Sequence, residues 1–228
     1  MNRRIALSVI VIAVILGALG LAGVFNRHSP PATVKPEKPS VTIALDPGHG
    51  GRDPGGVAGD VLEKDVNLAI VKKLAALVDA QPDLKAVLTR TSDVTVDNLA
   101  RLHMAEEANA ALYLSVHTNS YPDPSVHGAE TLVDNTRPPD GPSWKLAEFV
   151  QKALVGATEA RDRGVKSQEL YLQHTKIPAV SVEVGFITSP EERARLLDPT
   201  YQDKVAHGLL AGIVDYLRQA GLLPTLQA

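Results

Sequence analysis

Two histidines and a glutamate each lie at the end of a short apolar run of this chain. They are His49, His117 and Glu183, and the runs before them are 41–45, 111–116 and 179–182. Short runs that are rich in apolar and β-branched residues predict buried β-strands. Ligands of open α/β sheets bind beyond the carboxyl ends of the strands. We therefore expect these three side chains, all able to bind a metal or transfer a proton, to share one site.

Two imidazoles and one carboxylate form a common ligand set for catalytic zinc. Such a site leaves one coordination position for water, and the ion lowers the pKa of that water to about 7. Glu63 follows His49 by fourteen residues and would complete the set with His117. Because Glu63 lies just before an amphipathic segment, it is also placed to interact with a helix dipole alone. The sequence leaves both interpretations open, with Asp60 and Asp65 as rival ligands.

The position of Glu183 also suggests a chemical role. A carboxylate at the end of a buried strand is costly unless it is paired. Beside a zinc-bound water, Glu183 would act as general base and then as general acid toward the leaving amine. The alternative is a salt bridge, for example with Arg90 or Arg101.

The turn that carries His49 has little side-chain bulk. Its sequence, at 46–51, is Asp-Pro-Gly-His-Gly-Gly. Glycine permits positive φ and the close approach of a large ligand, and Pro47 favours a tight bend. The spacing matches neither the phosphate-binding loop nor the dinucleotide fingerprint. Of the remaining histidines, His127 could line a cleft, and the others are expected to be surface, packing or loop residues: His28, His103, His174 and His207.

Alternating strand and helix patterns must position these residues. The predicted strands are 41–46, 84–90, 111–117, 129–134, 169–173 and 179–184. The predicted helices are 65–80, 97–109, 143–157, 193–197 and 201–219. We expect Asp65 and Ser143 to cap two of these helices. This order predicts a single α/β domain whose sheet is largely parallel and flanked by helices on both faces.

The N-terminal segment 5–25 is uncharged and almost entirely apolar. As a helix rising ~1.5 Å per residue, it would span the ~30 Å hydrocarbon core of a bilayer. Arg3 and Arg4 precede it and favour a cytoplasmic N-terminus, so we expect an N-terminal membrane helix with the rest of the chain exported. The alternative is a cleaved signal peptide, whose apolar region is normally shorter. A proline-rich spacer at 26–40 and one catalytic domain at 41–228 are expected to follow.

Composition narrows the chemistry further. The chain has 228 residues and a formal net charge of −3, so we expect no basic face for nucleic acid. It contains no cysteine. Any metal site is therefore limited to His, Asp and Glu ligands, and disulfides contribute nothing to stability.

Several segments, in order along the chain, resemble the zinc-dependent N-acetylmuramoyl-L-alanine amidases, which are bacterial cell-wall enzymes of the Amidase_3 type. The matching segments are ALDPGHGG at 44–51, LEKDVNL at 62–68, LTRTSD at 88–93, 101–109, LSVHTN at 114–119, GAE at 128–130, TKIPAVSVEVGF at 175–186 and YQDKVA at 201–206. Together they cover nearly all of the expected domain, so the resemblance is far more specific than any single motif.

The resemblance implies that His49, Glu63 and His117 hold zinc and that Glu183 is the catalytic acid/base. It implies a twisted sheet of about six strands, and cleavage of the amide between N-acetylmuramic acid and the L-alanine of the peptidoglycan stem peptide. We expect a monomer on the cell-wall side of the cytoplasmic membrane, anchored there, or secreted if segment 5–25 is cleaved. The chain's size and N-terminal segment resemble the spore-cortex amidases.

The chain departs from the family pattern in one motif, and its residues also allow two other functions. The chain has Val-His-Thr-Asn at 116–119 where the family more often has Ile-His-Ala-Asn, which should alter the lining of the cleft but not zinc binding. Another zinc hydrolase of cell-wall material, such as a peptidase or deacetylase, would use the same residues. A wall-binding protein without turnover is the third interpretation, and the presence of all four polar residues argues against it.

Overall fold

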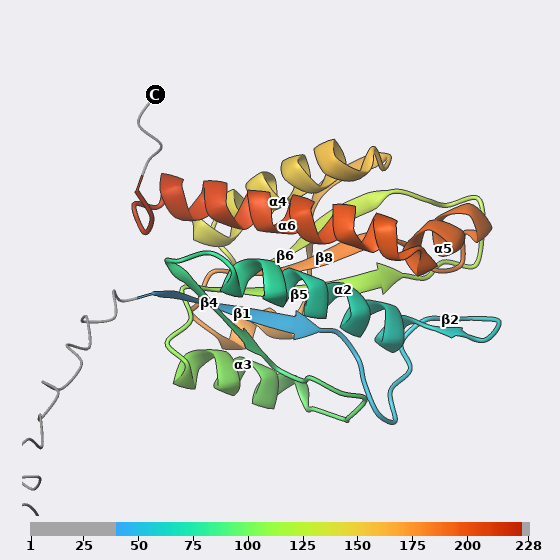
Figure 1. The fold of residues 1–228 in the computed structure, drawn as a ribbon, viewed down its shortest axis with the longest axis horizontal. Coiled ribbons are helices and arrows are strands. Elements are labelled where there is room, and N and C mark those ends of the chain that lie inside the picture. The colour runs from blue at the N-terminus through green and yellow to red at the C-terminus, as the bar shows by residue number, and fades with distance from the viewer. Residues whose placement is uncertain (1–39, 225–228) are drawn as a thin grey trace, which may run out of the picture. The chain divides into compact units, whose positions relative to one another are not determined.

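A six-stranded sheet forms the centre of the described part of the chain, residues 40–224 of a computed structural model (Figure 1). Its order is β4 (Leu84–Leu88), β1 (Val41–Pro47), β5 (Leu112–Asn119), β8 (Ala179–Phe186), β6 (Ala129–Asp134) and β7 (Asp162–Gln168). All neighbouring strands are parallel except β6 and β8, which are antiparallel. The predicted α/β fold with a mostly parallel sheet is therefore confirmed. The strands β1, β5 and β8 each begin with a mainly apolar run because helices cover both faces of the sheet.

Five helices among the described residues cover the two faces of the sheet. They are α2 (Glu63–Asp79), α3 (Asn98–Glu107), α4 (Pro142–Thr158), α5 (Pro190–Leu197) and α6 (Pro199–Gln219). Helices α2, α4 and α6 pack on one face and bury the larger apolar core, while α3 lies on the opposite face over a smaller one (Figure 1). An ideal Cβ at Gly212 would lie 2.6 Å from Val150 Cα, so glycine is needed where α6 crosses α4.

The prediction of a strand at 169–173 is wrong. The sixth strand is β7, at Asp162–Gln168, and Tyr171–His174 form a 3-10 helix, η1. The apolar residues that suggested a strand instead serve the smaller core, where Leu172 is buried. Strand β7 escaped prediction because it is a polar edge strand. A short antiparallel hairpin was also not predicted, with strands β2 (Val57–Ala58) and β3 (Val61–Leu62).

Two predicted helix caps are also wrong. Helix α2 begins at Glu63, with Leu62 at the N-cap position, so Asp65 lies inside the first turn. Helix α4 begins at Pro142, and Ser143 lies within it. In both cases a residue that suits the N-cap was available, but the tertiary structure starts the helix earlier. The hydroxyl of Ser143 instead accepts a hydrogen bond of 3.1 Å from the Ala179 backbone N–H at the start of β8.

The predicted membrane segment 5–25 and nearly all of the spacer 26–40 lie outside the described residues. Among residues 40–224, no helix has the combined length and hydropathy needed to span a bilayer.

Candidate metal centre and active site

Three side chains that are distant in sequence meet at the carboxyl ends of β1 and β5. His49, Glu63 and His117 each place one ligand atom so that the three atoms lie within 4.8 Å of one another. Glu63 Oε1 is 3.2 Å from His49 Nε2 and 3.0 Å from His117 Nδ1. The two imidazole rings lie edge to face, with their centroids 4.9 Å apart. The structure thus brings all three predicted ligands together.

The backbone at His49 is held in an unusual conformation. His49 has a φ of +62°, in the left-handed region, which costs a non-glycine residue about 1–3 kcal/mol. Two buried arginines fix the carbonyl groups around it. Arg90 donates to the carbonyls of Pro47 (2.8 Å) and Gly48 (2.9 Å). Arg101 donates to those of Pro47 (3.0 Å) and His49 (2.7 Å). These bonds hold the strained turn so that the imidazole of His49 faces Glu63.

Glycine is required where the loop passes the two imidazoles. An ideal Cβ at Gly48 would lie 2.2 Å from His117 Cε1. At Gly55, which has a φ of +67°, it would lie 2.6 Å from both His49 Cδ2 and Glu63 Oε2. The glycine-rich turn therefore serves the packing of the cluster itself, besides giving a ligand access.

Glu63 fits both interpretations offered by its sequence position. As the first residue of α2 it lies at the positive end of a helix dipole, and it also faces the two histidines. Its Oε2 accepts from the Gly56 N–H (2.7 Å), and its Oε1 accepts from the Thr118 N–H (3.2 Å). Burial alone would raise the pKa of Glu63, but hydrogen bonds and charge interactions with the two histidines hold it well below its usual range. Glu63 is therefore an anion.

Glu63 in turn affects the histidines. Burial would lower the pKa of each imidazole, but the neighbouring carboxylates outweigh that effect, with Glu63 acting on both rings and Glu183 also acting on His117. With a further contribution from Asp53, the pKa of His49 rises to about 9, and the pKa of His117 is also raised. Without a cation, protons occupy the space between the rings and the carboxylate. A metal that binds there must displace them, so binding should release protons.

The donor set fits zinc. Bonds of about 2.0–2.2 Å around a tetrahedral ion place its ligand atoms roughly 3.3–3.6 Å apart. The separations of 3.2 Å and 3.0 Å from Glu63 Oε1 to the two ring nitrogens are only slightly shorter, and all three ligand atoms lie within 4.8 Å of one another. Two imidazole nitrogens and one carboxylate oxygen also suit several other divalent ions, so the geometry fits a divalent cation without selecting zinc.

Glu183 lies beside this cluster on the next strand. It is the register partner of His117 in the β5–β8 pair. Its Oε2 is buried and has no hydrogen-bond partner among the described residues. Arg90 and Arg101 bind backbone carbonyls of the His49 turn. The alternative of a salt bridge between Glu183 and one of these arginines is therefore wrong. Burial raises the pKa of Glu183 to about 7, even though the charge of His117 partly opposes the shift.

The raised pKa predicts a pH-dependent stability of the metal-free protein. The usual pKa of a glutamate is about 4.5, so between pH 4.5 and 7 the folded protein holds a proton on Glu183 that the unfolded chain releases. Stability therefore falls as pH rises through this window, by about 1–3 kcal/mol. Glu183→Gln, which cannot ionise, should be more stable than wild type at pH 8 and about equal at pH 4. Urea unfolding of chelator-treated proteins measures this, and a stability difference that does not change with pH would contradict it.

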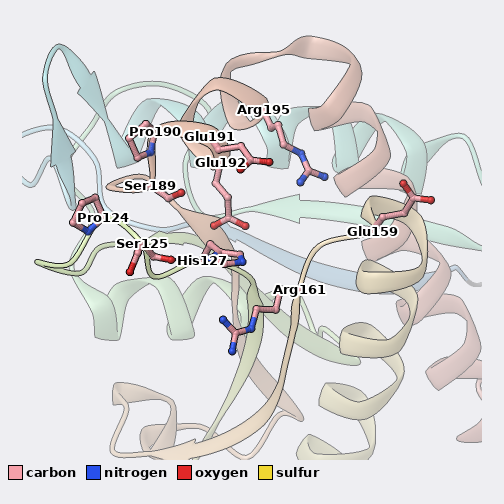
Figure 2. Close-up of a pocket in the computed structure, with 10 residues that line it drawn as sticks. All are labelled: Pro124, Ser125, His127, Glu159, Arg161, Ser189, Pro190, Glu191, Glu192 and Arg195. Atoms are coloured by element: carbon pink, nitrogen blue, oxygen red, sulfur yellow. Dashed lines mark hydrogen bonds between the residues drawn. The ribbon is translucent and has the colours of Figure 1, made fainter.

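A pocket of about 680 Å³ opens beyond the carboxyl end of β8 (Figure 2). Its lining residues include His127, Arg161 and Arg195, together with the buried Glu192. The Glu192 carboxylate accepts from the backbone N–H of Gly128 (3.0 Å) and of Phe186 (2.7 Å), which joins the start of β6 to the end of β8. None of the four predicted site residues lines this pocket. The pocket is therefore a separate cavity at the same edge of the sheet as the His–Glu–His cluster.

Two further polar residues that the sequence did not single out contact the histidines. Asp53 Oδ2 lies 2.7 Å from His49 Nδ1, and Ser115 Oγ lies 3.0 Å from His117 Nε2. A signal for Ser115 was present, because residues two apart on a strand share a face. Asp53 lies four residues after His49, but only the fold of the turn shows that it returns to the ring.

The fold and the site define a class of protein: an α/β domain with a His–Glu–His cluster that could hold a metal ion and a neighbouring glutamate with one buried oxygen at the carboxyl edge of its sheet. Comparison with known families makes the assignment specific. The model of the family described as N-acetylmuramoyl-L-alanine amidase matches residues 43–215, and the chain belongs to this family. The prediction of an amidase that acts on the peptidoglycan amide bond is therefore confirmed.

Individual relatives agree with the family assignment. The chain is 38% identical over 178 residues to the N-acetylmuramoyl-L-alanine amidase LytC of Bacillus subtilis, which covers 78% of this chain but only 36% of LytC. It is 33% identical to the germination-specific N-acetylmuramoyl-L-alanine amidase of the same organism, over 78% of this chain and 81% of that protein. The crystal structure of an N-acetylmuramoyl-L-alanine amidase from Clostridium difficile 630 matches with a TM-score of 0.76 and 35% identity, over 79% of this chain and 98% of that one.

Proposed function

We propose that this chain hydrolyses the amide between N-acetylmuramic acid and the L-alanine of the stem peptide, with Zn²⁺ held by His49, Glu63 and His117 and with Glu183 as acid/base. One observation carries the proposal. Glu183, whose Oε2 is buried without a hydrogen-bond partner, is the register partner of His117 in a three-residue cluster that could hold a metal, in a chain that belongs to an amidase family.

The donor atoms that would hold zinc are His49 Nε2, Glu63 Oε1 and His117 Nδ1, because these three atoms converge. Zinc, when bound, supplies a Lewis acid that polarises an amide carbonyl and lowers the pKa of water. The arginine-fixed turn and the start of α2 hold two of the three ligands on rigid backbone. Little reorganisation is then needed as charge develops in the reaction.

Glu183 handles the proton of the reaction. It takes a proton from the attacking water as the oxygen–carbon bond forms, and delivers it to the alanine nitrogen as the carbon–nitrogen bond breaks. A group that must both accept and donate works best with a pKa near the operating pH. The pKa of about 7 that burial gives Glu183 supports this double role. A bound cation nearby would lower that value and favour the base form at the start of the reaction.

Product analysis tests the proposal against its alternatives. The purified zinc-loaded protein is incubated with peptidoglycan, and the soluble fragments are examined by mass spectrometry and amino-group labelling. We expect a new free amino group on L-alanine and intact glycan N-acetyl groups. Released acetate would indicate a deacetylase, and cleavage within the stem peptide would indicate a peptidase. Zinc-loaded protein that binds the wall and releases nothing would indicate a wall-binding protein.

We further propose that the catalytic domain, 41–228, acts on the cell-wall side of the cytoplasmic membrane. The uncharged segment 5–25 supports export, as an uncleaved anchor or as a signal peptide, and 26–40 would then serve as the spacer. N-terminal sequencing of the protein from membrane and secreted fractions distinguishes these two. The spore-cortex role and the monomeric state suggested by the resemblance stay predictions.

A further inference from the structure

A buried carboxylate lies behind the metal ligand His117. Asp46, on β1, is fully buried, and each of its oxygens accepts two hydrogen bonds. Oδ1 accepts from Thr89 Oγ1 and from Arg101 Nη1 (2.6 Å). Oδ2 accepts from Ser115 Oγ (2.7 Å) and from Tyr171 OH (3.2 Å). Burial alone would raise the pKa of Asp46, but Arg101 and the hydroxyl donors hold it below its usual range. Asp46 is therefore an anion that can only accept hydrogen bonds.

Ser115 connects this anion to the imidazole. A serine hydroxyl has a single proton, and the charged carboxylate of Asp46 is the stronger acceptor for it. With that proton directed to Asp46, Ser115 Oγ has only lone pairs to offer His117 Nε2, which lies 3.0 Å away. His117 Nε2 must then carry a proton and donate it. The other ring nitrogen, Nδ1, is the one that faces Glu63 Oε1.

We propose that Ser115, oriented by Asp46 and Arg101, is a positioning residue that holds the proton of His117 on Nε2 and so reserves Nδ1 for the metal. The inference rests on the proposed metal site, to which it adds Ser115, Asp46 and Arg101 as supporting residues. Metal-bound histidines generally donate their second N–H to a partner that fixes the tautomer and the orientation of the ring. Here that partner is a neutral hydroxyl with a buried Asp–Arg ion pair behind it.

Water can replace the hydrogen-bond partner of His49 but not that of His117. The Asp53 side chain, which contacts His49, is 61% exposed, so water can take its place. Ser115 is fully buried between β1 and β8, its register neighbours being Asp46 and Ser181. No solvent reaches this position to replace a lost hydroxyl. The loss of Ser115 should therefore leave His117 Nε2–H without an acceptor, and the ring without a fixed orientation.

Ser115→Ala tests the inference, with Ser181→Ala as the matched control. Ser181 is a buried serine beside Ser115 on the neighbouring strand, but its hydroxyl bonds neither Asp46 nor His117. Zinc dissociation constants are measured by competition with a chelator on the full-length protein. We expect Ser115→Ala to weaken zinc binding about 10–100-fold. Ser181→Ala should bind zinc like wild type, and Ser115→Thr, which keeps the hydroxyl, should bind more tightly than Ser115→Ala.

A spectroscopic readout separates positioning from a general loss of stability. In zinc-loaded wild type, ¹⁵N-histidine NMR should show His117 bound through Nδ1, with a slowly exchanging proton on Nε2. In Ser115→Ala that proton should exchange rapidly, while the unfolding transition stays cooperative. An unchanged zinc affinity and an unchanged Nε2 proton in Ser115→Ala would overturn the inference. A wild-type protein that fails to bind zinc at all would instead overturn the proposed function on which the inference rests.

Discussion

Glu183→Gln is expected to lower the turnover of peptidoglycan by about 10²–10⁴-fold, the range typical of a lost general acid/base. Zinc should still bind, because Glu183 is not among the three converging ligands. Glutamine keeps the size of the side chain and removes its ability to exchange a proton. The wild-type Oε2 is buried without a hydrogen-bond partner, so the substitution breaks no bond at that atom.

The measurement for Glu183→Gln is a rate of amino-group release together with bound zinc per chain. Glu130→Gln is the matched control, since Glu130 is the register partner of Glu183 on β6 but is ion-paired with Arg163 (2.6 Å). Removing that charge should change turnover far less. If Glu183→Gln cleaves the wall at the wild-type rate, Glu183 is not the acid/base.

His117→Ala and His49→Ala are each expected to abolish stoichiometric zinc binding, and activity with it. Each removes one of three ligand atoms and leaves Glu63 Oε1 with one imidazole instead of two. The loss should exceed the 10–100-fold effect expected of a residue that only supports a ligand. Metal analysis after dialysis, followed by the activity assay with and without added zinc, measures both effects.

His103→Ala provides the control for the histidine variants. His103 lies on α3 and its side chain is 75% exposed, so its removal changes the histidine count without touching the cluster. It should retain zinc and turnover. Retention of one zinc per chain by both His49→Ala and His117→Ala would show that the ion binds elsewhere.

The parts of the fold that the sequence predicted are those with a strong periodic signal. The strands β1, β5 and β8 are buried on both faces, so their apolar runs were unmistakable, and the polar residues that end them could be placed at one edge. Strand β7 carried no such signal, since its sequence is polar and it pairs at the sheet edge. Helix starts were misplaced at Asp65 and Ser143, because local capping preference is weak against tertiary packing.

The sequence predicted the residues of the candidate site that end apolar runs, but not the residues that support them. Residue type and strand position suggested His49, His117 and Glu183, and the family resemblance favoured Glu63. The side chains that support these four residues come together only through the register of the paired strands, and the sequence alone does not predict that register. Ser115 bonds Asp46 because β5 pairs with β1 in one particular alignment. A shift of a single residue would turn the Ser115 side chain to the other face of the sheet.

Anomalous X-ray scattering from crystals of the zinc-loaded protein tests the central claim most directly. We predict one strong zinc peak within about 2.0–2.2 Å of His49 Nε2, Glu63 Oε1 and His117 Nδ1, with Glu183 beside it and not bound to it. A zinc peak at any other place, or a cluster in which the two imidazoles bind no common ion, would contradict the account.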